Sequence, residues 1–69
     1  MKISARNILR GKVKKVTTGA VNSEVVLELP GGQEIVSVIT NASSAALGLS
    51  AGKVAYAIVK ASNVMVGVD

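Results

Sequence analysis

Apolar and polar residues alternate along most of the chain with a period close to two. This period is the repeat of a β-strand that is covered on one face only. The pattern predicts five strands, over residues 8–16, 21–29, 33–40, 53–60 and 64–68. We therefore expect an all-β protein.

Glycine-rich and polar positions interrupt the alternation. Gly11, in the middle of the first predicted strand, indicates a bend or a β-bulge. Residues 17–20, Thr-Thr-Gly-Ala, have the chemistry of a turn, and Pro30-Gly31-Gly32 is a strong hairpin signal. The second and third strands are thus each expected to turn back beside the strand before them.

The segment 41–47 departs from strand alternation, because its residues are small and tolerate a helix. Thr40 or Asn41 can serve as the N-cap, and Gly48 supplies a C-terminal stop. Three strands, a short helix and two further strands are the order of a five-stranded oligonucleotide/oligosaccharide-binding (OB) barrel. The alternative, an SH3-like barrel, does not normally place a helix between its third and fourth strands.

The chain has 69 residues and shows no linker, internal repeat or low-complexity segment, so residues 1–69 are expected to form a single OB-like domain. It is 49% apolar with almost no aromatic residues, which is more apolar strand surface than one small barrel can cover. Strands that are apolar on both faces generally cover a partner. We therefore expect a homo-oligomer, on the evidence of Val26, Val36, Val38, Ala55, Ala57 and Val59.

Composition argues against most enzymatic chemistry. The chain has no His and no Cys, which excludes thiol nucleophiles, imidazole bases, disulfides and the usual zinc sites. Its carboxylates are scattered, so neither an acid–base pair nor a cage for a bare metal cation is expected. The sequence predicts a protein that is not an enzyme and carries no cofactor.

The net charge of +4 points to an anionic partner. A basic OB-fold nucleic-acid-binding protein is the alternative function, supported by the run Lys12, Lys14 and Lys15. However, single-strand binding normally uses several aromatic faces, and Tyr56 is the only aromatic residue. A solvated strand face is the simpler interpretation of the lysines.

No targeting or membrane segment is visible. Met1-Lys2 leads directly into strand-like sequence without an apolar leader. The longest apolar run, residues 54–59, is far shorter than the roughly 18 residues that a membrane span requires. We expect a cytoplasmic protein with no membrane partner.

Two short polar clusters carry most of the remaining chemistry. Ser4-Ala5-Arg6-Asn7 precedes the first strand, and Lys60-Ala61-Ser62-Asn63 follows the fourth. Nearly every polar group in them can donate a hydrogen bond, and neither cluster contains a carboxylate. Such a set suits a small, fully ionised oxyanion.

At these positions the chain resembles molbindins, the small cytoplasmic Mop-family proteins that bind molybdate. The resemblance is carried by Ser4-Ala5-Arg6-Asn7 followed by Gly11, by Ile39-Thr40…Ser43, by Leu47-Gly48-Leu49…Gly52 and by Val59-Lys60-Ala61-Ser62. It implies an OB-type barrel and a homohexamer built as a trimer of dimers. It also implies that the protein stores or buffers molybdate or tungstate, which lies between subunits.

The resemblance further implies which residues bind the oxyanion. Ser4 and Arg6 would come from one subunit, while Thr40, Ser43, Lys60 and the backbone around Ala61 would come from its neighbour. A second class of site near the threefold axis is assigned to the turn formed by Gly19, Ala20, Val21 and Asn22. The complete expected interface set is Ser4, Ala5, Arg6, Thr40, Ser43, Lys60, Ala61 and Ser62.

Overall fold

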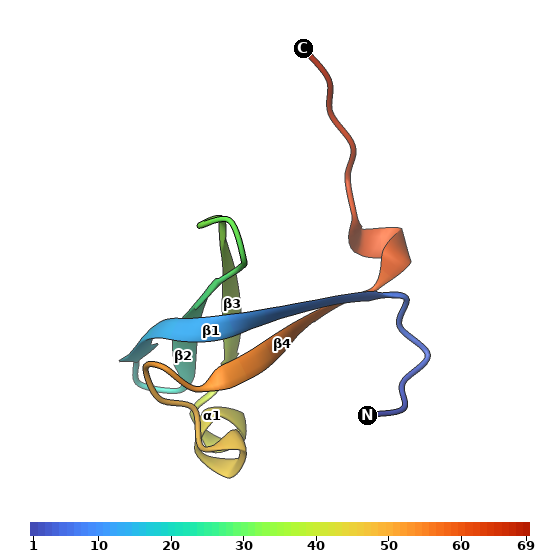
Figure 1. The fold of residues 1–69 in the computed structure, drawn as a ribbon. Coiled ribbons are helices and arrows are strands. Elements are labelled where there is room, and N and C mark those ends of the chain that lie inside the picture. Colours follow the sequence, from blue (N-terminus) through green and yellow to red (C-terminus); the bar gives the residue numbers. More distant parts are fainter.

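The computed structural model describes residues 1–69 and contains four strands and two short helices (Figure 1). In chain order these are β1 (Asn7–Thr18), β2 (Asn22–Glu28), β3 (Glu34–Thr40), α1 (Asn41–Leu47), β4 (Val54–Val59) and the 3₁₀ turn η1 (Ala61–Asn63). Neither helix has the length and apolar character needed to cross a bilayer.

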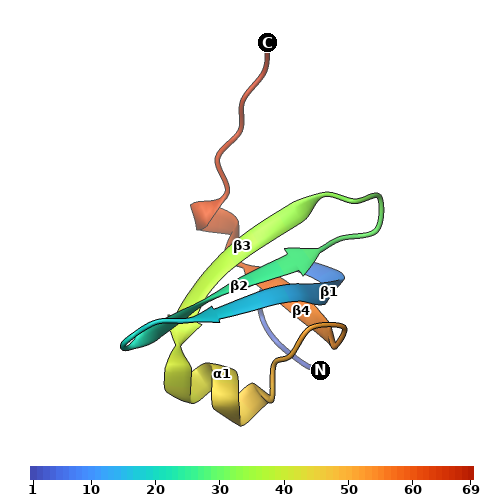
Figure 2. The same cartoon turned by 90° about the vertical axis from the view of Figure 1, so that its left-hand side faces the viewer.

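The strands form one antiparallel sheet in the order β3-β2-β1-β4. The long strand β1 pairs with β4 over its first half, from Asn7 to Lys12, and with β2 from Lys12 onward. Because β1 changes partner at Lys12, the sheet curls instead of lying flat (Figure 2). The predicted all-β class, with a curled sheet and one short helix after the third strand, is confirmed.

The predicted fifth strand is wrong. Residues 64–68 pair with no strand, and the segment after η1 runs away from the sheet in both views (Figures 1 and 2). In η1 the N–H groups of Asn63 and Val64 donate to the carbonyls of Lys60 and Ala61 (2.9 and 3.3 Å), which turns the chain away from β4. Strand-like alternation in residues 64–68 therefore did not identify a pairing partner for them. Without a fifth strand, the single chain does not close the barrel between β3 and β4.

Of the two alternatives predicted for Gly11, a bend or a β-bulge, the structure excludes the bulge. The shift in register lies between Val13 and Lys15, whereas Gly11 pairs regularly with Ala55 of β4. A Cβ at Gly11 would lie 2.6 Å from the carbonyl oxygen of Glu28. A side chain at this position is disfavoured because the carbonyl at the end of β2 lies too close to β1.

The local turn and helix predictions are confirmed. The hairpin after β2 closes through the N–H of Gly32, which donates to the carbonyl of Leu29 at 3.0 Å. The side chain of Thr40 caps α1 by accepting from the N–H of Ser43 at 3.0 Å. At its other end α1 stops at Gly48, whose φ of 61° lies in the left-handed region that glycine tolerates.

The core is small and aliphatic. Val13, Val25 and Leu27 form its centre, and half-buried side chains of β3 and β4, among them Ile35 and Ala57, pack against them. Only 7 of 69 residues are buried, so much apolar surface stays in contact with solvent. Val26 is buried within the protomer, which corrects the expectation that it lies on uncovered surface.

The outward face of β3 matches the expectation of excess apolar surface. Val36 and Val38 are exposed there, as are Tyr56 and Ile58 on β4. Of the residues expected to be uncovered, Ala55, Ala57 and Val59 are half-buried. The structure thus leaves apolar strand surface along both edge strands, where a partner could cover it.

Candidate functional site

The two donor clusters found in the sequence lie next to each other at one end of the sheet. Asn7 pairs with Val59, so the first cluster ends and the second begins at the same end of the sheet (Figure 1). The side-chain amide of Asn7 also donates to the carbonyl of Val59 at 3.2 Å, 52 positions away in the sequence. Asn7 therefore holds the two segments in register. We name this group, Ser4, Ala5 and Arg6 with Lys60, Ala61 and Ser62, the paired donor cluster.

The polar side chains of the paired donor cluster have no partner within the protomer. Ser4, Arg6, Lys60 and Ser62 are exposed, and none takes part in a side-chain hydrogen bond or a salt bridge. Their hydroxyl, guanidinium and ammonium groups are available to an external acceptor. Since all four are exposed to solvent, one protomer supplies hydrogen-bond donors for a site but no residues that would enclose a bound ligand.

A second polar group lies at the other end of β1, where the turn of residues 19–22 meets the start of α1. The backbone N–H of Asn41 donates to the carbonyl of Val21 at 2.9 Å, and its side-chain amide donates to the carbonyl of Gly19 at 2.9 Å. The buried hydroxyl of Ser23 donates to the side-chain oxygen of Asn41 at 2.6 Å. These bonds bring Thr40 and Ser43 next to the turn that was assigned to a second site.

Sequence reasoning missed this use of Asn41 and Ser23. Asn41 was considered only as a possible N-cap, and Ser23 shares one face of its strand with Val25 and Leu27. A hydroxyl on an otherwise apolar strand face was the available signal, because a buried hydroxyl needs a hydrogen-bond partner. The partner could not be named without the fold.

The hydroxyls of Thr40 and Ser43 are coupled to each other. Thr40 Oγ1 accepts from the N–H of Ser43, and the two hydroxyl oxygens lie 2.9 Å apart, within hydrogen-bond distance. Their contact uses one of the two hydroxyl protons. The pair therefore keeps one hydroxyl proton that has no acceptor in the protomer.

The structure does not combine the two groups in one protomer. The paired donor cluster lies at the start of β1, and Thr40 and Ser43 lie next to its end, with α1 and η1 apart in both views (Figures 1 and 2). Lys60 and Ala61 follow β4 at the end of the sheet where Ser4 and Arg6 of the same chain precede β1. The resemblance had grouped Lys60 and Ala61 with Thr40 and Ser43 on the neighbouring subunit.

Acidic side chains neutralise part of the basic strand β1. Lys14 forms the only salt bridge, with Glu34 of β3, and this hydrogen bond raises the pKa of Lys14 above its usual 10.5. Lys12 stands opposite Glu28 in the β1–β2 register. The lysine run that supported nucleic-acid binding is thus interleaved with carboxylates, which disfavours a phosphate-backbone contact there. No group of three or more His, Cys, Asp or Glu side chains is gathered anywhere.

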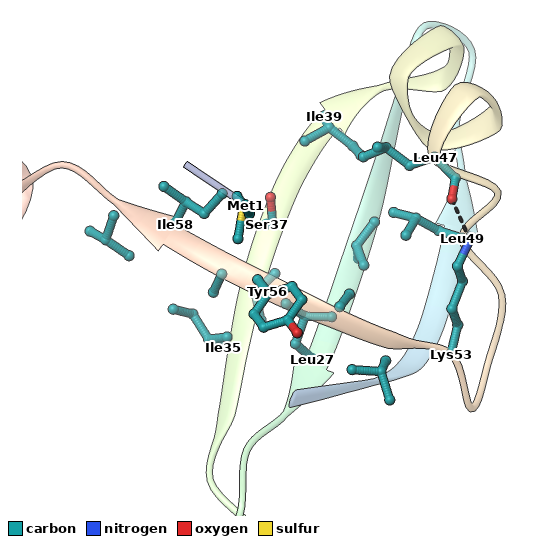
Figure 3. Close-up of a pocket in the computed structure, with 16 residues that line it drawn as sticks. Met1, Leu27, Ile35, Ser37, Ile39, Leu47, Leu49, Lys53, Tyr56 and Ile58 are labelled. Atoms are coloured by element: carbon teal, nitrogen blue, oxygen red, sulfur yellow. Dashed lines mark hydrogen bonds between the residues drawn. The ribbon is translucent and has the colours of Figure 1, made fainter. Parts of the chain in front are cut away.

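An apolar groove of about 480 Å³ lies between the edge strands β3 and β4 (Figure 3). Of its 16 lining residues 14 are hydrophobic, and Ser37 and Lys53 are the other two. Met1 lies at the end near Ile58, and the ammonium of Lys53 donates to the carbonyl of Leu47 at the other. We call this the open-edge groove. Its apolar lining does not suit an oxyanion.

Comparison with known proteins gives a consistent result. Residues 3–66 match the TOBE domain family. The chain is 49% identical over 69 residues to a probable molybdenum-pterin-binding protein of Haemophilus influenzae, with both chains covered completely. The structure of MopII from Clostridium pasteurianum superposes with a TM-score of 0.92 at 45% identity, covering 97% of this chain and 100% of the other. A structure of the cytoplasmic molybdate-binding protein ModG with molybdate bound superposes with a TM-score of 0.95 at 55% identity, covering all of this chain and 49% of the other.

Proposed function

The chain belongs to the TOBE domain family, and on that premise we propose that it binds molybdate or tungstate in the cytoplasm, as a store or buffer of the oxyanion. The observation that carries this proposal is the paired donor cluster, in which two donor-rich segments without any carboxylate, residues 4–6 and 60–62, adjoin the backbone pair Asn7–Val59. Relatives are named as molybdenum-pterin-binding proteins, and the ModG structure holds molybdate, which supports a molybdenum-containing ligand.

The chemistry of the ligand fits these donors. Molybdate is a dianion that carries no proton at neutral pH, so a suitable site offers donors and no acceptor. Arg6 can bind two oxygens at once through its planar guanidinium, whereas Lys60 acts as a point charge. Phosphate usually carries a proton and would need an acceptor carboxylate, which the cluster lacks. Sulfate has the charge of molybdate, so it can be refused only by the size of the assembled site.

The assembled site requires more than one protomer. The paired donor cluster is exposed to solvent, and the pair Thr40 and Ser43 presents one free hydroxyl proton at a different place on the surface. We propose that a neighbour's Thr40 and Ser43 close the site over Ser4 and Arg6 in a homohexamer arranged as a trimer of dimers. A second class of site, at residues 19–22, would lie near its threefold axis. The protein acts by binding rather than by catalysis.

Calorimetric titration of the purified oligomer with molybdate, tungstate, sulfate and phosphate tests the proposal. We expect heat of binding with molybdate and tungstate, and much weaker or no binding of sulfate and phosphate. Equal affinity for sulfate would remove the claim of selectivity. An absence of heat with all four anions would remove the function itself.

Light scattering on the ligand-free protein tests the assembly separately. We expect a hexamer with and without the oxyanion, because the apolar strand surface needs cover in both states. A monomer at micromolar concentration would contradict the proposed interface site.

A further inference from the structure

The two segments of the paired donor cluster begin where the pairing of β1 with β4 ends. Asn7 and Val59 form the outermost backbone pair of the two strands, so residues 4–6 come just before it and residues 60–62 just after it. Pairs at the end of a ladder open most readily, because a further pair supports them on one side only. Opening of this pair would free both donor segments at once.

One side-chain hydrogen bond secures this outermost pair. Nδ2 of Asn7 donates to the carbonyl oxygen of Val59 at 3.2 Å, and the Asn7 side chain is half-buried. No other side-chain hydrogen bond or salt bridge involves residues 1–11 or 54–69. Met1, at the end of the open-edge groove, is 74% exposed and gives the N-terminal segment little support (Figure 3). Asn7 is thus the main side-chain restraint on both donor segments.

Asn7 stands apart from the exposed donors of the cluster. Side chains alternate between the two faces of a strand, and the register of β1 is regular as far as Val13. Asn7 therefore shares the face of β1 that carries the buried residues Gly11 and Val13. Arg6 and Lys60, by contrast, are exposed to solvent. This placement suits a residue that acts on the donors rather than one that binds the anion itself.

We propose that Asn7 is a positioning residue of the oxyanion site, whose bond to Val59 holds residues 4–6 and 60–62 in place before the anion arrives. A segment that becomes ordered only on binding loses conformational entropy at that moment, and this cost lowers the affinity. Loss of the Asn7 bond should therefore weaken binding although no group that contacts the anion is removed. The inference rests on the oxyanion binding proposed above.

Calorimetric titration with molybdate measures the effect on affinity. Asn7→Ala should weaken binding about three- to tenfold, the range that corresponds to the loss of one ordinary hydrogen bond. Glu34→Gln is the matched control, because it also disrupts one side-chain contact, that between Lys14 and Glu34, beyond the part of β1 that pairs with β4. The control should stay within about twofold of the wild type. Wild-type affinity in Asn7→Ala would overturn the inference.

A double-mutant cycle separates positioning from direct contact with the anion. If Asn7 acts through Arg6, part of what it positions is already missing in Arg6→Ala. Asn7→Ala should then weaken molybdate binding by a smaller factor in the Arg6→Ala background than in the wild type. Equal factors in the two backgrounds would show that Asn7 and Arg6 contribute independently, which would contradict the positioning role.

Hydrogen exchange of the ligand-free protein tests the structural step without any anion. In Asn7→Ala the protected backbone amides nearest to the Asn7–Val59 pair should exchange faster than in the wild type, whereas those of β2 should keep their rates. Asn7→Asp has nearly the same size, but its carboxylate cannot donate, so it should exchange like Asn7→Ala. Wild-type exchange in Asn7→Asp would show that shape, and not the hydrogen bond, secures the pair.

These experiments distinguish the positioning role from the function on which it rests. If the wild-type protein gives no heat with molybdate, the proposed function fails and the positioning role fails with it. If the wild type binds and Asn7→Ala binds equally well, only the positioning role fails. Circular dichroism and light scattering of Asn7→Ala should match the wild type. Weaker binding together with an altered fold or oligomer would overturn the inference, because the whole site would then be disturbed.

Discussion

Replacing Gly11 by Ala tests how closely β2 approaches β1. An added Cβ would lie 2.6 Å from the carbonyl oxygen of Glu28 and 3.2 Å from Cδ2 of Leu29. Normal contacts between carbon and oxygen are about 3.3 Å or longer, so the overlap with the carbonyl is roughly 0.7 Å. The Leu29 side chain can rotate, whereas the Glu28 backbone is held in register with Lys12 and Glu34 on both sides. The strain cannot be relieved without disturbing the sheet.

The expected loss follows from these contacts. Overpacking that shifts backbone costs about 1–3 kcal/mol, and the rigid neighbour places Gly11→Ala in the upper half of that range. Replacing glycine by alanine also lowers the conformational entropy of the unfolded chain, which stabilises the folded state by about 0.4–1 kcal/mol. The net loss is therefore about 2 kcal/mol. For a domain of this size it corresponds to a fall in melting temperature of about 8–16 °C.

Urea denaturation followed by circular dichroism, at one fixed protein concentration, measures this loss. A fixed concentration is needed because association adds to apparent stability. Lys12→Ala, at the next position of β1, is the matched control and should stay within about 0.5 kcal/mol of the wild type. If Gly11→Ala were as stable as that control, the close approach of Glu28 would not constrain position 11, and the explanation of this glycine would be wrong.

Three further predictions concern individual side chains. Arg6→Ala should weaken oxyanion binding in calorimetry about ten- to a hundredfold or more, because hydrogen bonds to charged groups are worth about 1.5–3 kcal/mol each. The control Lys15→Ala should change the affinity less than about twofold. Equal losses in the two variants would show that a diffuse basic field, and not a defined site, attracts the anion. Thr40→Ala should lower the free energy of unfolding by about 1 kcal/mol through loss of the α1 cap, whereas Thr40→Ser should keep most of that stability. Equal free energies of unfolding for the two variants in urea denaturation would contradict the capping role. Glu34 raises the pKa of Lys14, so the stability that this pair contributes is fully present below pH 10.5 and is lost as the pH rises through the higher folded pKa. Across that range the free energy of unfolding should fall less in Glu34→Gln than in the wild type. Parallel curves for the two proteins would refute the linkage.

Local features could be predicted from the sequence because neighbouring residues alone decide them. The helix begins after Thr40 and stops at Gly48, since a threonine side chain satisfies a free N–H at one end and a glycine takes a positive φ at the other. The hairpin at residues 30–32 follows from two consecutive glycines with φ near +90°. The alternation of β2 likewise placed Val25 and Leu27 in the core. None of these outcomes depends on a distant part of the chain.

Pairing between distant segments could not be predicted in the same way. Gly11 suggested a bulge, yet its role depends on the carbonyl of Glu28, which approaches only after β2 has folded onto β1. The alternation of residues 64–68 predicted a strand, but a strand also needs a free neighbouring edge, and η1 directs these residues away from the one in their own protomer. Alternation shows that a segment can pair and does not show with what.

By itself, the sequence determined which chemistry was available: donor groups in two clusters, no carboxylate among them, and neither His nor Cys for catalysis. Only the tertiary structure decided which of these donors meet. The segments that carry Arg6 and Lys60 meet at one end of the sheet because Asn7 pairs with Val59 across 52 positions. Thr40 and Ser43 lie elsewhere, because one ends β3 and the other belongs to α1. The donors are a property of single residues, whereas their grouping depends on strand register, which is set by backbone hydrogen bonds between distant segments.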